Sequence, residues 1–138
     1  MELVIVVVII GIVAAIAVPR LAGATERATS ATLAGQVRTF QNAVDLYAAE
    51  HDGRTPAHDA DGNIDADAAR FAQRLLERTD TLGHVVPGGE FGPYLRAIPV
   101  NPVNKRDSLR VVADPPDADG YAWRFVVSTS AIESDCTE

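Results

Sequence analysis

Cysteine, lysine and aromatic residues are scarce in this chain of 138 residues. Cysteine occurs once, as Cys136, which excludes an internal disulfide framework and a zinc site built from several cysteines. Lysine also occurs once, and the net charge is −7, whereas a nucleic-acid-binding module normally carries a basic face. Charged residues make up 22% and hydrophobic residues 47%, a balance that argues against intrinsic disorder. The length suits one ordinary domain.

Familiar catalytic motifs are absent as well. The sequence contains no Walker A loop, no HExxH helix and no GxGxxG turn, and its serines lack the GxSxG context of a nucleophile elbow. The histidines fall in expected loops, with no shared helix face or strand to bring them together: His51, His58 and His84. We therefore do not expect an enzyme.

Apolar residues are distributed unevenly along the chain. The segment from Leu3 to Val18 reads LVIVVVIIGIVAAIAV, without one polar side chain, and the chain from Pro19 onward has an ordinary soluble composition. As a helix this segment would extend about 24 Å, somewhat short of a hydrocarbon core of ~30 Å. A strand of that length with two apolar faces would not fit a small domain, so a helix in lipid is predicted.

Three interpretations of the apolar segment are open. A cleaved secretory signal is suggested by Ala15-Ile16-Ala17, but the residues before the run carry no positive charge. A plain membrane anchor leaves Glu2 without a partner, and Arg20 and Arg27 would then place the domain in the cytoplasm. In the third interpretation Glu2 pairs with a positive group of a neighbouring chain, such as an N-terminal amine. A carboxylate at the edge of hydrocarbon costs up to about 2.5–3.5 kcal/mol, so a partner is expected.

The residues MELVIVVVIIGIVAAIAVP resemble the N-terminus of type IV pilins and pseudopilins. Proteins of that family carry a glutamate, an apolar helix that often contains a glycine, and a proline, and Glu2, Gly11 and Pro19 keep the same spacing. Their mature chain begins with a methylated phenylalanine a few residues before the glutamate, so we expect further residues and a basic leader upstream of Met1. The segment GPYLRAIPVNP, residues 92–102, resembles a second segment that occurs in the major pseudopilins of type II secretion systems.

This resemblance implies a fold, a function and partners. The implied fold is α+β, with a long N-terminal helix whose hydrophobic half protrudes and whose amphipathic half packs on a small antiparallel β-sheet. The implied function is that of a structural subunit of a helical filament, either a type II secretion pseudopilus or a type IV pilus. Such a subunit waits in the bacterial inner membrane, is processed by a prepilin peptidase, and is assembled by an ATPase and its platform into a homo-oligomer. Its final location would be periplasmic or extracellular, no cofactor is required, and no nucleic acid is expected. A membrane-anchored monomeric binding domain is the alternative.

The sequence divides into a hydrophobic helix over 1–19 and a headgroup over 20–138. The headgroup is predicted to begin with an amphipathic helix over 20–52, because apolar residues recur there at helical spacing. They are Leu33, Val37, Phe40, Val44 and Tyr47. We expect one long helix in all, flexible between about Gly11 and Pro19.

The remainder of the headgroup is predicted to contain a loop and a short helix over 53–80. This helix would run from 66 to 79, with Asp65 or Asp67 as its N-cap. A Gly/Pro-rich loop over 82–104 and antiparallel strands over 108–133 would follow, because large residues alternate with smaller or polar ones from Tyr121 to Ser128.

Two acidic segments raise the possibility of calcium binding. Residues 59–67, DADGNIDAD, resemble part of an EF-hand loop, but its first and last ligand positions fall on Ala57 and Ala68, so a turn at Asp61-Gly62 is favoured. The expected hairpin connection after the first strand contains three carboxylates, in the region where pseudopilins often hold calcium. The resemblance makes them a candidate metal site, with a solvated turn as the alternative: Asp114, Asp117 and Asp119.

Overall fold

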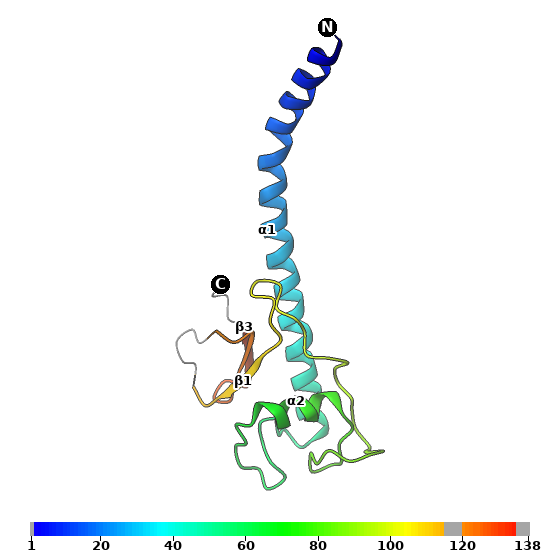
Figure 1. Ribbon diagram of the computed structural model, residues 1–138. Helices are drawn as coiled ribbons and strands as arrows, with labels where there is room; N and C mark the ends of the chain where they lie inside the picture. Colours follow the sequence, from blue (N-terminus) through cyan, green and yellow to red (C-terminus); the bar gives the residue numbers. More distant parts are fainter. Residues whose placement is uncertain (1, 115–119, 135–138) are drawn as a thin grey trace. The chain divides into compact units, whose positions relative to one another are not determined.

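The computed structural model of the chain describes residues 2–114 and 120–134. It contains two helices, α1 (Glu2–Glu50) and α2 (Ala68–Leu76), and three strands, β1 (Leu109–Val112), β2 (Trp123–Val126) and β3 (Ala131–Ser134). The chain divides into two compact units, Met1–Thr32 and Leu33–Glu138, and the division falls within α1. A long N-terminal helix together with a small sheet confirms the expected α+β, pilin-like class (Figure 1).

Helix α1 contains 49 residues and continues through Pro19. Its end follows from the residues after Glu50. Asp52 and Gly53 both have positive φ angles, and the Gly53 amide donates to the carbonyl of Ala48 at 2.8 Å. This bond satisfies a carbonyl that the last turn of a helix otherwise leaves free.

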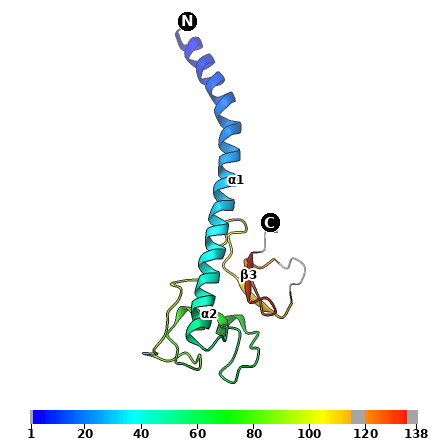
Figure 2. The same ribbon diagram turned by 180° about the vertical axis from the view of Figure 1, so that it is seen from behind.

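The headgroup core forms where the apolar stripe of α1 packs on the sheet. Phe40, Val44 and Tyr47 are fully buried, and the Phe40 ring meets the Trp123 ring edge-on at 5.9 Å between centroids. Phe71 of α2 packs against Phe125 of β2 at 4.8 Å. Figure 2 shows the reverse view, in which the sheet lies beside residues 33–50 of α1 and α2 lies at the C-terminal end of that helix. Buried residues from both described helices and all three described strands thus share one core.

The sheet is mixed, so the prediction of an antiparallel sheet is wrong for one of its two strand pairs. β1 pairs with β2 in parallel, with Leu109 opposite Trp123, and β2 pairs with β3 in antiparallel fashion, with Phe125 opposite Ile132. Because a hairpin joins antiparallel strands, the expected hairpin between β1 and β2 is wrong. Alternation of inward and outward residues is the same for both pairing directions, which is why the sequence pattern could not distinguish them.

Candidate functional site

The apolar half of α1, residues 3–18, exposes a continuous run of apolar side chains. Within the described residues, α1 alone is long and apolar enough to cross a membrane, and none of its apolar window is buried. Large apolar side chains there are all more than half exposed: Leu3, Val4, Ile5, Val6, Val7, Val8, Ile9, Ile10, Ile12, Val13, Ile16 and Val18. Burying one such side chain is worth about 1.5–3 kcal/mol, so together they represent on the order of 20 kcal/mol. By its length and composition, α1 is a weak candidate for a membrane anchor.

Glu2, Gly11 and Pro19, the residues that the resemblance makes candidates for a role in assembly, all lie along this helix. Glu2 begins α1 and is exposed, and Gly11 is exposed in the middle of the apolar run, with open space where a side chain would project. Pro19 lies within the bounds of the same helix. Because they are separated along one helix, the three residues do not converge on a single point in the subunit.

The candidate calcium site lies largely outside the described residues. Asp114 is exposed just after β1, and Asp117 and Asp119 belong to the segment that the structure does not describe. Among residues 2–114 and 120–134, no group of three histidine, cysteine, aspartate or glutamate side chains could hold a metal ion.

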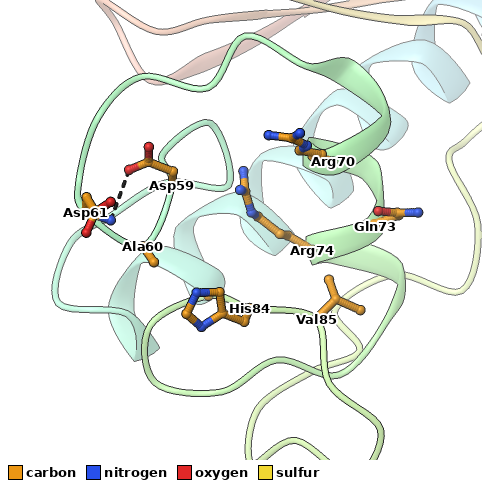
Figure 3. Close-up of a pocket in the computed structure, with 9 residues that line it drawn as sticks. Asp59, Ala60, Asp61, Arg70, Gln73, Arg74, His84 and Val85 are labelled. Atoms are coloured by element: carbon orange, nitrogen blue, oxygen red, sulfur yellow. Dashed lines mark hydrogen bonds between the residues drawn. The ribbon is translucent and has the colours of Figure 1, made fainter.

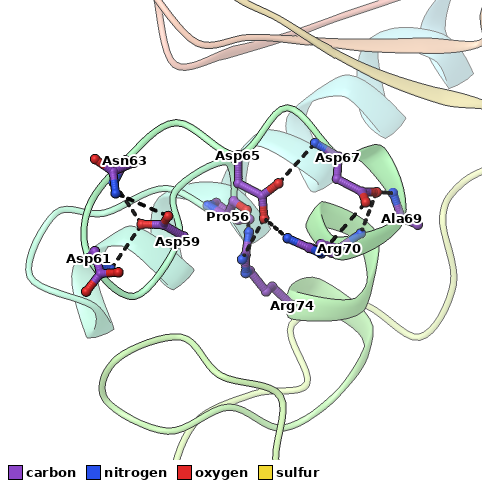
Figure 4. A network of polar contacts seen from close by, with 9 residues as sticks. All are labelled: Pro56, Asp59, Asp61, Asn63, Asp65, Asp67, Ala69, Arg70 and Arg74. Carbon is purple, nitrogen blue, oxygen red and sulfur yellow. Dashed lines mark hydrogen bonds and ion pairs between the residues drawn. The ribbon is translucent and has the colours of Figure 1, made fainter.

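Residues 59–63 form a turn that is closed by the Asp59 carboxylate (Figure 4). This carboxylate accepts hydrogen bonds from the backbone amides of Asp61 at 3.0 Å and Asn63 at 2.8 Å. The backbone bond from Asn63 contributes most to lowering the pKa of Asp59 below its usual value. The oxygens of Asp59 thus serve the turn, as expected for an aspartate whose side chain mimics a backbone turn.

Beside this turn, Asp65 and Arg74 form a largely buried ion pair. The Arg74 guanidinium lies 3.0 Å from the Asp65 carboxylate and donates to the carbonyl of Pro56 at 2.7 Å. Burial alone would raise the pKa of Asp65, but the hydrogen bond from Arg74 and the amide of Asp67 outweigh it and lower the pKa. Asp67 is the N-cap of α2, where its carboxylate accepts from the amide of Ala69 at 2.8 Å. The ion pair fixes the 56–65 segment against α2.

An open cavity of about 470 Å³ lies next to this network (Figure 3). It is bounded by the 59–61 turn, by α2 and by residues 83–85, and six of its nine lining residues have polar side chains: Asp59, Asp61, Arg70, Gln73, Arg74 and His84. The imidazole of His84 pairs with the Asp80 carboxylate at 3.1 Å. Because the lining residues come from three separate segments of the chain, no single sequence motif predicts the cavity. Its mixture of carboxylates and guanidinium groups suits a small polar group better than an apolar ligand.

Residues 92–102 contact the C-terminal ends of both α1 and α2. The Tyr94 hydroxyl donates to the Glu50 carboxylate at 2.6 Å, and the amides of Tyr94 and Leu95 both donate to the carbonyl of Leu75. Burial, followed by the bond to Glu50, raises the pKa of Tyr94. Nearby, Asn101 is fully buried and donates to the carbonyl of Ala122 at 3.0 Å. These contacts give the segment a structural role.

His51 is a buried residue that the sequence pattern did not reveal. The prediction placed it in a loop, and it lies directly after α1 with only 2% of its surface exposed. Its ring stacks on Tyr47 at 3.9 Å and its nitrogens lie within hydrogen-bonding distance of the Tyr47 carbonyl and the Thr79 hydroxyl. It therefore connects the end of α1 to the 79–85 loop.

Comparison with known proteins gives no match for this chain. No family model matches it, and neither a curated protein nor a solved structure is significantly similar to it.

Proposed function

We propose that the chain is a structural subunit of a type IV pilin-like helical filament. The observation that carries this proposal is the 49-residue helix whose apolar half is exposed and whose second half contributes Phe40, Val44 and Tyr47 to the headgroup core. Supporting it are the positions of Glu2, Gly11 and Pro19 within one helix. A purely soluble domain would not leave so much apolar surface without a partner.

In this proposal the apolar segment occupies two environments in succession. It first holds the subunit in the inner membrane, and after processing by a prepilin peptidase an assembly ATPase and its platform transfer it to the filament. Lipid is as apolar as another helix, so the transfer gains little from the hydrophobic effect. Close packing, and pairing of Glu2 with the N-terminal amine of an adjacent subunit, would favour the filament. Helices offset along an axis make head-to-tail contacts that do not close, which generates a filament.

The proposal is tested by Glu2→Ala, with Glu26→Ala as the matched control because Glu26 is an exposed acid of the same helix. Membrane fractionation measures insertion, and negative-stain microscopy measures filaments. We expect Glu2→Ala to insert normally and to assemble slowly or not at all, whereas Glu26→Ala assembles. Normal filaments from Glu2→Ala would contradict the pairing.

The 92–102 segment favours a type II secretion pseudopilus over a surface pilus, and filaments seen outside unaltered cells would favour the pilus.

A second candidate function is a membrane-anchored monomeric binding domain, which the polar cavity of about 470 Å³ favours. Sedimentation of the full-length protein separates a monomer from a polymer. The encoded sequence upstream of Met1 gives a further test, because a basic leader that ends in glycine and is followed by phenylalanine is expected for the pilin assignment.

A further inference from the structure

Among the described strands β3 lies at one edge of the sheet, because the strand order is β1-β2-β3. In an antiparallel pair, the amide and carbonyl of every second residue point away from the partner strand. Such an edge is a template on which another chain can add a strand, and proteins normally protect it.

One side chain of α1 occupies this edge. The Gln41 carboxamide oxygen accepts from the amide of Ile132 at 2.8 Å, and its nitrogen donates to the carbonyl of Ser130 at 3.0 Å. This carbonyl and amide flank residue 131 and face the same side of an extended chain. They are the two groups that one residue of a parallel neighbouring strand would bind.

The orientation of the Gln41 amide is fixed from within α1. Its nitrogen also donates to the Asp45 carboxylate at 2.8 Å, one helical turn further on. Both acceptors, the Ser130 carbonyl and the Asp45 carboxylate, therefore face the nitrogen, and the one donor, the Ile132 amide, faces the oxygen. All hydrogen-bonding groups of the carboxamide have partners.

The contact lies at the margin of the core. Ile132 is 5% exposed and stands opposite Phe125 of β2, which is fully buried. Without Gln41, the Ile132 amide would need another hydrogen-bond acceptor, from water or from another chain, next to packed apolar side chains. An unpaired polar group in such a place is unfavourable, so an alternative partner would be bound readily.

We propose that Gln41 acts as a side-chain substitute for a fourth strand. It closes the β3 edge and prevents that edge from pairing with β3 of a second copy of this chain. Asp45 acts as a positioning residue for the Gln41 amide. The proposal concerns the headgroup and does not depend on filament formation.

The test uses Gln41→Met in the full chain in detergent micelles, which cover the apolar half of α1. Methionine keeps nearly the same volume and removes both hydrogen bonds to β3. We expect hydrogen exchange at the Ile132 amide to become about fivefold faster, the equivalent of the ~1 kcal/mol typical of one hydrogen bond. Asn42→Ala is the control, because Asn42 is the exposed neighbour in α1. Unchanged exchange at Ile132 in Gln41→Met would overturn the proposal.

Sedimentation velocity of the same samples tests whether Gln41 prevents self-association of the chain. We expect Gln41→Met to form larger species than the wild-type chain and Asn42→Ala, and a Gln41→Met protein that stays at the wild-type size would overturn this role. Asp45→Ala provides a second route if Gln41→Met does not fold. It keeps the bonds to β3 but removes their positioning, so a smaller increase in Ile132 exchange is expected, and no increase would contradict the positioning role.

Discussion

Replacing Gly83 with alanine should destabilise the headgroup through two separable effects. Gly83 has a φ angle of +84°, and an added Cβ would overlap the hydroxyl of Tyr47. Alanine in the left-handed region costs about 1–2 kcal/mol. Overpacking a well-packed site costs a further ~1–3 kcal/mol. Tyr47 is 1% exposed and stacked on His51 with an interplanar angle of 7°, so its ring cannot move aside easily.

The magnitude follows from adding the two effects, which gives a loss of about 2–5 kcal/mol in the free energy of unfolding. Gly88→Ala is the matched control, because Gly88 has a φ angle of +78° and nothing lies within 4 Å of an added Cβ. This variant should lose only the ~1–2 kcal/mol of backbone strain. In a Tyr47→Phe background, Gly83→Ala should cost about as much as Gly88→Ala, since the overlapping hydroxyl is gone.

The assay is urea unfolding of the full chain in detergent, followed by tryptophan fluorescence. The chain has a single tryptophan, Trp123, and it is fully buried on β2, so its emission reports on the headgroup core. A Gly83→Ala free energy within ~0.5 kcal/mol of wild type would refute the reasoning, because surface changes without a structural cause fall in that range. An equal cost with and without the Tyr47 hydroxyl would refute the overlap.

Three further predictions concern other parts of the chain. Asp67→Ala removes the N-cap of α2 and should lower the free energy of unfolding by about 1 kcal/mol in the same urea assay, and an unchanged midpoint would contradict the cap. The pKa values of Asp59, Asp65 and Asp80 are lowered from 3.8 in the folded chain, so these carboxylates stabilise the fold above that pH and this stabilisation is lost as the pH falls through their folded-state pKa values. Urea midpoints measured from neutral to acidic pH should therefore fall at the acidic end, less steeply in Asp65→Asn, and an identical slope would contradict the Asp65 contribution. Pro19→Ala restores a backbone donor and should stiffen α1, so filament rise and twist should change in helical reconstructions; unchanged values would show that this proline has no effect on assembly.

Elements in which apolar residues recur at a regular spacing were predictable from the sequence. The stripe from Leu33 to Tyr47 is buried or partly buried in the structure, and α2 lies within the range predicted for the short helix. The turn at 59–63 follows from Asp and Gly, whose turn chemistry is local. Local signals of this kind do not depend on the rest of the fold.

Long-range features were not predictable in the same way. The parallel pairing of β1 with β2 is one such feature, because the alternation of side chains along a strand is the same in parallel and antiparallel pairs. Buried Arg74 binds the carbonyl of Pro56 and the carboxylate of Asp65, and buried His51 contacts the carbonyl of Asp80. These partners are distant in sequence, so the neighbouring residues do not predict the burial. Gln41 reaches β3 across 91 positions of sequence, so its contact appears only in three dimensions.

In the proposed function, the exposed apolar half of α1 first holds subunits in a membrane and then holds them together in a filament. The most direct measurement is the size distribution of the full-length protein extracted from its native host, by sedimentation and by negative-stain microscopy. Filaments of uniform diameter that contain this chain as their main component are the expected result. A preparation that keeps α1 intact and remains a single small species under all assembly conditions would contradict the account.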